Sequence, residues 1–195
     1  MCLLFETIKV INKNLQNIEY HNSRLNRSRK ELFGADDFIY LENIIKIPSS
    51  LSDDVYKCRV IYDKKIEKIE FEPYKPRIIH SLKLVECNDI EYGFKYHDRS
   101  MINELFEKRG DCDDILIIRN GWVTDTSFSN IILFNGKQWV TPSHPLLFGT
   151  KRQKLLDEGK IISKKIKSED ISKYQGARLI NSMLDPEDGF LLTFF

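Results

Sequence analysis

Several short stretches of the chain are enriched in β-branched residues or alternate between apolar and polar residues, which is typical of β-strands. In the first half these stretches are residues 3–11, 15–18, 57–62, 65–72 and 78–86. A turn at Lys13-Asn14 separates the first two and predicts a hairpin. We expect the last three to form one antiparallel unit, with Pro73 and Pro76 marking a break inside it.

Two Asn-Gly pairs divide much of the second half into further strands. Asn120-Gly121 and Asn135-Gly136 suit tight turns, because both residue types tolerate a positive φ. They predict a meander of strands over residues 115–119, 122–124, 129–134 and 137–141. Two more apolar strands are expected at residues 178–180 and 190–194.

Helical spacing of apolar residues is found in three places, each ending at a glycine or just before one. These are residues 22–33, 99–109 and 151–159. No element is assigned to residues 36–54, which are mixed in character and contain Pro48. The pattern predicts an α+β protein with antiparallel strands and few helices. We expect a small N-terminal subdomain, residues 1–86, and a larger C-terminal one, residues 87–195.

Composition and charge narrow the classes of partner. The 195 residues include 30 Lys and Arg against 29 Asp and Glu, so no strong field favours nucleic acid or a membrane surface. The opening MCLLFETIK is too short and polar for a signal peptide, and no later run reaches membrane-spanning length. The cysteines and histidines lack metal-ligand spacing. We expect a cytoplasmic protein that binds a small molecule and no metal.

Three polar segments carry residue types that suit a phosphorylated cofactor. They are YHNSRL, FKYHDR and the region from VTDTSFSN to PLLFGTKR. Gly149-Thr150 precede a predicted helix, whose N-terminal N–H groups, together with an arginine, could hold a phosphate. A lysine that reacts with a carbonyl must be neutral part of the time, which cationic neighbours favour. Lys95, with Arg99 close in sequence, meets this demand, and Asp125 could stabilise a protonated pyridine nitrogen.

Each of these features also has an ordinary interpretation. Most lysines are solvated, an aspartate in a TDTS run commonly caps a turn, and Gly-Thr before a helix commonly only starts it. The residues alone therefore predict a phosphate site with one poised lysine and no more.

The order of five segments adds a resemblance. FETIKV, HNSRL, FKYHDR, NGWVTDTSFSNIILF and TPSHPLLFGTKRQKLL are similar to the successive motifs of the class IV aminotransferase family. The match extends from Phe5 to about Asn181. It implies the D-amino-acid aminotransferase-like fold of fold-type IV enzymes, which use pyridoxal 5′-phosphate (PLP). It also implies a two-fold homodimer and an amine as the small-molecule substrate.

The resemblance assigns the central roles to three residues. Lys95 would carry the cofactor as a Schiff base and act as the general base. Arg24 would bind the cofactor phosphate, and Asp125 would face the pyridine nitrogen. Many relatives have glutamate at the position of Asp125, so the shorter side chain could need a shift or a water to make this contact.

Further cofactor contacts are implied at the start of the last helix and after the carboxylate. Thr150 and Lys151 would offer backbone N–H groups to the phosphate, and Asn130 would shape the cofactor bed. Relatives commonly have a threonine at position 151, so the Lys151 ammonium would either bind phosphate as a point charge or point to solvent. The chain is also shorter than typical relatives, in its N-terminal subdomain.

The residues that follow Lys95 favour a lyase reaction. Arg99 follows Lys95 by four positions, which resembles the KxxxR wording of aminodeoxychorismate lyases, enzymes that release pyruvate. A transaminase for D- or branched-chain amino acids is one alternative, and a non-catalytic PLP-binding relative is another. Arg59, in KCRVIYD, could bind a substrate carboxylate or be an ordinary half-buried strand arginine, and Arg99 is a second candidate for the substrate.

Overall fold

The computed structural model describes residues 2–188 and 192–195, which form two compact units. Unit 1 comprises Met1–Pro76 and Phe94–Asp98, and unit 2 comprises Arg77–Gly93 and Arg99–Phe195. This division differs from the boundary that we predicted at residue 86, because the strand Ser81–Glu86 pairs inside unit 2.

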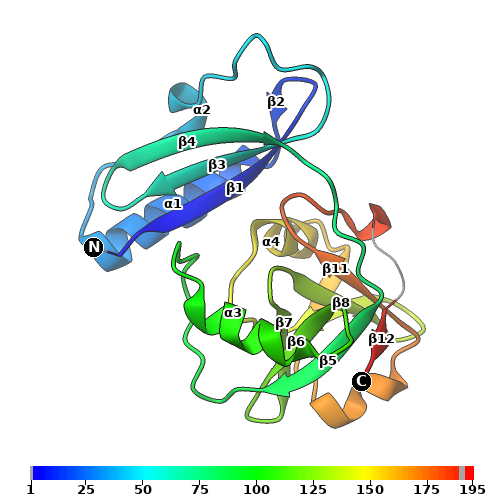
Figure 1. The fold of residues 1–195 in the computed structure, drawn as a ribbon. Coiled ribbons are helices and arrows are strands. Elements are labelled where there is room, and N and C mark those ends of the chain that lie inside the picture. Colours follow the sequence, from blue (N-terminus) through cyan, green and yellow to red (C-terminus); the bar gives the residue numbers. More distant parts are fainter. Residues whose placement is uncertain (1, 189–191) are drawn as a thin grey trace. The chain divides into compact units, whose positions relative to one another are not determined.

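Unit 1 is a four-stranded antiparallel sheet with one long helix, α1, along one of its faces (Figure 1). The strand order is β2-β1-β3-β4. The elements are β1 (Leu4–Ile11), β2 (Asn14–Leu15), α1 (Ile18–Phe33), α2 (Leu41–Ile44), β3 (Tyr56–Tyr62) and β4 (Ile66–Pro73). Alternate residues of β1, among them Ile8 and Val10, pack with Leu25 of α1 in the core of this unit.

The helix α1 begins four residues before its predicted start, and the second strand is correspondingly shorter than predicted. The cause lies at Asn17, whose φ of 53° is left-handed and redirects the chain from the hairpin into the helix. The helix ends at Gly34, as predicted, with a φ of 61° that favours glycine.

Unit 2 contains two four-stranded sheets, in the orders β12-β5-β6-β7 and β10-β9-β8-β11. Its strands are β5 (Ser81–Glu86), β6 (Asp114–Arg119), β7 (Trp122–Thr126), β8 (Asn130–Phe134), β9 (Trp139–Pro142), β10 (Ile161–Lys164), β11 (Gly176–Ile180) and β12 (Thr193–Phe194). Its helices are α3 (Ser100–Phe106), α4 (Thr150–Asp157) and the 3₁₀ turns η1 (Glu107–Arg109), η2 (Ser168–Lys173) and η3 (Pro186–Asp188).

Both faces of β6 are buried, which explains its unbroken apolar run. Leu116 and Ile118 lie in a core that the two sheets of unit 2 share, whereas Ile115 and Ile117 pack against α3. The other sheet is built in the same way, with α4 packed on its outer face. Strands that are covered on both sides lack an alternating pattern, so length and turn residues had to identify them.

One strand prediction is wrong. The segment 78–86 does not continue the sheet of β3 and β4, because β5 pairs in parallel with β6 in unit 2. Pro76 lies in the connection between β4 and β5 and has no N–H to donate to a ladder, so the chain leaves the first sheet there.

Both Asn-Gly hairpins are confirmed. The turn between β6 and β7 has positive φ at Asn120 (51°) and Gly121 (77°), and β8 pairs in antiparallel fashion with β9 around Asn135-Gly136. The predicted strand 190–194 lies in part outside the described residues, and β12 covers its last two positions.

Candidate active site

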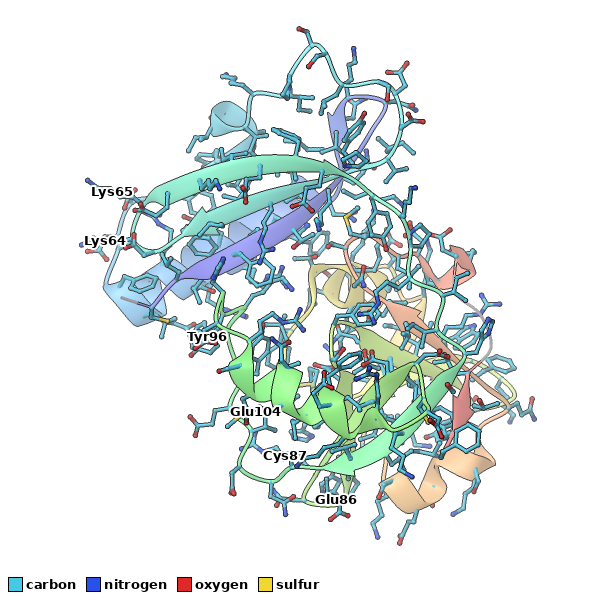
Figure 2. All side chains as sticks on the ribbon, in the orientation of Figure 1. Lys64, Lys65, Glu86, Cys87, Tyr96 and Glu104 are labelled. Atoms are coloured by element: carbon cyan, nitrogen blue, oxygen red, sulfur yellow. The ribbon has the colours of Figure 1, made fainter. Side chains whose placement is uncertain are left out.

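Lys95 lies in the segment 94–98, which is attached to the start of β1 in unit 1. The Phe5 N–H donates a hydrogen bond of 3.0 Å to the Lys95 carbonyl oxygen. The neighbouring Tyr96, labelled in Figure 2, forms an isolated β-bridge with Leu4. Strand-like bonds on both sides therefore hold the backbone of Lys95 in place.

The ring of Phe5 packs against two cationic side chains. Lys95 Nζ lies 4.7 Å from the ring centroid and Arg59 Cζ lies 4.4 Å from it, both within cation–π range. Because the two distances end at the same point, Lys95 Nζ and Arg59 Cζ are at most about 9 Å apart. Among the described residues, the buried Arg59 Nε has no hydrogen-bond partner. Two cationic side chains are therefore held on one aromatic ring.

A charged cluster that we did not predict lies on the other side of β1, in the core against α1. Glu6 accepts hydrogen bonds from Arg24 Nε (2.8 Å) and Arg24 Nη2 (2.5 Å), and its Oε2 lies 2.6 Å from His21 Nδ1. Glu6 and His21 are fully buried, and Arg24 is nearly so. The alternation of β1 carried a signal for this cluster, since Glu6 occupies a core-facing position together with Ile8 and the other apolar residues.

The partners of Glu6 decide its charge. Burial raises the pKa of Glu6, but the Arg24 charge and the hydrogen bonds from His21 and Arg24 outweigh burial and lower it to about 2. Burial lowers the pKa of His21, against the influence of Glu6, and the charges of Arg24 and Lys95 lower it further. With His21 neutral and Glu6 ionised, His21 Nδ1 must carry the hydrogen and donate a hydrogen bond to the Glu6 carboxylate.

In unit 2, Asp125 lies in β7 with both carboxylate oxygens bound. Oδ1 accepts a hydrogen bond from Asn130 Nδ2 (2.7 Å), and Oδ2 accepts one from the Leu147 N–H (2.9 Å). Burial raises the pKa of Asp125 to about 6, although these donors and the Arg152 charge oppose the rise. The fold thus brings two predicted residues, Asp125 and Asn130, into direct contact.

The loop before α4 closes onto Asn130. The side-chain amide of Asn130 also donates a hydrogen bond to the Leu147 carbonyl oxygen (2.9 Å). Gly149 precedes the first helical residue, Thr150, and a Cβ at this glycine would overlap with Asn130 Oδ1. The predicted helix start is confirmed, and glycine is required there because Asn130 packs so close to its Cα. Buried Thr150 lies at the positive end of the helix dipole.

The remaining predicted residues of unit 2 have definite partners. Lys151 is buried, and its ammonium forms an ion pair with Asp185. Arg99 precedes α3 and donates a hydrogen bond to the Ser127 carbonyl oxygen. Lys151 is therefore neither solvated nor without a counter-ion, and Arg99 contacts the loop that follows Asp125.

A turn after β11, which we did not predict as part of the site, also lies beside this loop. Asn181 Nδ2 donates to Ser129 Oγ (2.8 Å), and Asn181 Oδ1 accepts the Met183 N–H (2.8 Å). The preceding residue, Ile180, pairs with Asn130 across the sheet. Only strand pairing brings these distant segments together, so local sequence patterns carried no signal for the contact.

The structure also bears on metals and membranes. Within residues 2–188 and 192–195, no group of three His, Cys, Asp or Glu side chains is placed to hold a metal ion. Over the same residues, no helix has the length and apolar character needed to cross a membrane.

Comparisons with known proteins agree with the fold and the motifs. The family model for amino-transferase class IV matches residues 92–185. An uncharacterised protein of Haemophilus influenzae is 44% identical over 182 residues, which cover 92% of this chain and 97% of that protein. The crystal structure of a proposed 4-amino-4-deoxychorismate lyase from Haemophilus somnus 129PT is 35% identical, with a TM-score of 0.88 over 97% of this chain and 98% of that one.

A more distant structure shares the fold. A hypothetical aminotransferase from Mycobacterium tuberculosis, in a PLP-bound form, is 18% identical with a TM-score of 0.76 over 93% of this chain and 78% of that one. The α+β fold is thus that of an enzyme of the fold-type IV class. The chain belongs to the class IV aminotransferase family. The predicted fold class and family are confirmed.

Proposed function

We propose that this chain is a PLP-dependent enzyme that acts on an amine bearing a carboxylate group. The observation that carries the proposal is the packing of Lys95 and Arg59 on one buried ring, that of Phe5. The residues that we propose to hold the cofactor, following the family resemblance, are Lys95, Arg24, Asp125, Asn130, Thr150 and Lys151.

The side chains have the chemistry that PLP requires. Lys95 offers an amine for the carbonyl group, Arg24 offers a guanidinium for the phosphate, and Asp125 offers a carboxylate for the ring nitrogen. When bound, PLP supplies an electron-withdrawing ring that stabilises negative charge on the substrate α-carbon. The PLP-bound state of the Mycobacterium tuberculosis protein with the same fold supports this choice.

Asp125 is suited to hold a proton on the ring nitrogen. Its carboxylate is oriented by Asn130 and the Leu147 N–H, and its pKa of about 6 leaves it mostly ionised at neutral pH. A positive charge placed against the carboxylate would lower this pKa and keep Asp125 ionised.

Arg59 and Lys95 are the residues that we propose to bind and deprotonate the substrate. We infer that Arg59 binds the carboxylate through N–H···O contacts of about 2.7–2.9 Å. Lys95, whose Nζ packs on the same Phe5 ring as Arg59 Cζ, would then take the α-proton of the substrate as general base. The loss of Arg59 should therefore weaken binding of the carboxylate while PLP is retained.

Release of pyruvate from an aminodeoxychorismate-like substrate is the reaction that we favour. It is supported by the 35% identical protein, a proposed 4-amino-4-deoxychorismate lyase, and by the spacing of Lys95 and Arg99. Amine transfer from D- or branched-chain amino acids is the second candidate, since the same deprotonation by Lys95 serves both reactions. The predicted homodimer and a cytoplasmic location remain proposals beside it.

The test compares the wild-type protein with Lys95→Ala and with Lys65→Ala, a control at an exposed lysine of the β3–β4 turn (Figure 2). Purified protein is incubated with PLP, reduced with borohydride and mapped by peptide mass spectrometry. We expect the wild type and the control to carry reduced cofactor on Lys95 and the Lys95→Ala variant to carry none. Absence of label at Lys95 in the wild type would overturn the proposal.

The same preparations separate the two reactions. Pyruvate release from aminodeoxychorismate without an amine acceptor supports the lyase. Formation of a keto acid from D- or branched-chain amino acids, which requires a keto-acid acceptor, supports the transaminase. Bound PLP without either product would point to the non-catalytic alternative.

A further inference from the structure

Helix α1 carries two arginines that pair with a carboxylate through two hydrogen bonds, and the two pairs differ in burial. Arg24 pairs with fully buried Glu6. Arg29 pairs with Asp37 at 2.8 and 2.9 Å, and the Asp37 side chain is 68% exposed. Arg29 also donates to the carbonyl oxygen of Lys64, so it links α1 to the β3–β4 turn. Arg29 is itself buried, but its carboxylate partner is exposed and the pair has a structural task, whereas the Arg24–Glu6 pair, buried on both sides, needs a separate explanation.

Stability alone does not explain the buried pair. Removing two charges from water is costly, and well-packed apolar residues commonly stabilise such a position as well or better. Glu6 nevertheless occupies a core position of β1, and it brings in His21 as a second donor. A cluster that is costly to bury and tightly hydrogen-bonded suggests a functional requirement for a fixed guanidinium.

The hydrogen bonds around Glu6 fix the orientation of the Arg24 guanidinium. Glu6 takes the Nε–Nη2 edge of Arg24 through one hydrogen bond to each of its carboxylate oxygens. His21 donates to the same carboxylate through Nδ1, which limits rotation of Glu6 and, through it, of the guanidinium plane. Two-point attachment pre-orients the arginine before any anion arrives.

We propose that Glu6 is a positioning residue that orients Arg24 for the phosphate of the cofactor. This inference rests on the proposed function, in which Arg24 binds that phosphate. It adds a requirement of its own, because the contribution of the phosphate group to binding should depend on Glu6.

The experiment measures the affinities of PLP and of pyridoxal, which lacks the phosphate, for the wild type and for Glu6→Gln. The amide keeps the size of the side chain but cannot accept both arginine hydrogen bonds together with that from His21. We expect the variant to bind PLP roughly tenfold more weakly, the effect of one lost charge-assisted bond. Its affinity for pyridoxal should change by less than about twofold.

A double-mutant cycle asks whether the effect passes through Arg24. In an Arg24→Gln background, Glu6→Gln should leave the ratio of PLP to pyridoxal affinity unchanged, because the residue that it orients is gone. Asp37→Asn serves as the matched control, since it breaks the other arginine–carboxylate pair of α1 and should not alter the ratio. Thermal unfolding of every variant separates a loss of folding from a loss of orientation.

The outcomes distinguish a failure of the proposed function from a failure of the positioning role of Glu6 alone. If the wild type shows no label on Lys95 after reduction, the proposed function fails. If Lys95 is labelled but Glu6→Gln weakens PLP and pyridoxal equally, or weakens neither, the positioning role is wrong and the proposed function stands. A ratio that still falls in the Arg24→Gln background, or that falls as far in Asp37→Asn, also overturns the positioning role.

Discussion

The two units each bury a carboxylate at their candidate site, and the two carboxylates respond to burial in opposite ways. Glu6 of unit 1 has its pKa lowered to about 2, whereas Asp125 of unit 2 has its pKa raised to about 6. Burial alone raises both values. The difference arises because Glu6 contacts the Arg24 guanidinium directly, whereas the hydrogen bonds to Asp125 come from neutral amide groups.

The comparison shows that the charge of the nearest donor, and not the depth of burial, sets the ionisation of these acids. Glu6 is ionised throughout the working pH range and is part of the scaffold. Asp125 is poised near pH 6, so its charge depends on what is placed against it. A protonated ring nitrogen would act on Asp125 as Arg24 acts on Glu6, which is the role that we propose for this residue.

The largest loss of stability is expected from Glu6→Ala, which removes the buried carboxylate of unit 1. It leaves the Arg24 charge buried without its carboxylate, which typically costs about 3–5 kcal/mol. Urea unfolding at pH 7 measures the loss, with Glu6→Gln as the milder reference. A loss below about 1 kcal/mol would mean that water or another acid replaces Glu6 and that the pair is not the scaffold described here.

The ion pair of Glu6 should also make the stability of the wild-type protein depend on pH in the acid range. The folded pKa of Glu6 is lowered from 4.5 to about 2, so the carboxylate stabilises the fold above pH 4.5 and this contribution is lost as pH falls toward 2. The free energy of unfolding of Glu6→Ala should therefore depend less on pH over that interval than that of the wild type.

Asp125 should contribute the reverse pH dependence, with a smaller effect that Asp125→Asn removes. The folded pKa is raised from 3.8 to about 6, so the wild-type fold favours the protonated acid. That stability is fully present below pH 3.8 and is lost as pH rises through 6, a change of about 3 kcal/mol from a shift of roughly two units. The asparagine variant should lack this slope in urea unfolding without cofactor. An unchanged slope would show that Asp125 is not the titrating group.

The fold was predictable wherever the pattern is local. The 3.6-residue spacing and its glycine stops located α1, α3 and α4, and the two Asn-Gly turns located four strands of unit 2. The placement of β5 was not predictable in this way, because its partner β6 lies about 30 residues further on and both strands are buried. Pairing of that kind is decided by tertiary packing and not by periodicity.

The candidate site was predictable to a different degree in each unit. The contact of Asp125 with Asn130 follows from neighbouring positions in one motif. Glu6 was seen only as a polar interruption of an apolar stretch, because its meaning depends on Arg24, which lies 18 residues away on another element. A charged residue at a core-facing position of a predicted strand is the signal that would have directed attention to it.

The smallest effect is expected at the loop that orients Asp125, with Gly149→Ala. The added methyl group overlaps with Asn130 Oδ1, so Asn130 must shift and its hydrogen bond to Asp125 weakens. Overpacking of this kind costs about 1–3 kcal/mol, and loss of the donor should raise the pKa of Asp125 further. Gly93→Ala is the matched control, because a Cβ at Gly93 meets no described atom within 4 Å. A midpoint for the pH-dependent stability that moves upward in Gly149→Ala and not in Gly93→Ala would establish that the loop before α4 tunes this acid. Equal midpoints would show that the contact with Asn130 does not set the pKa of Asp125.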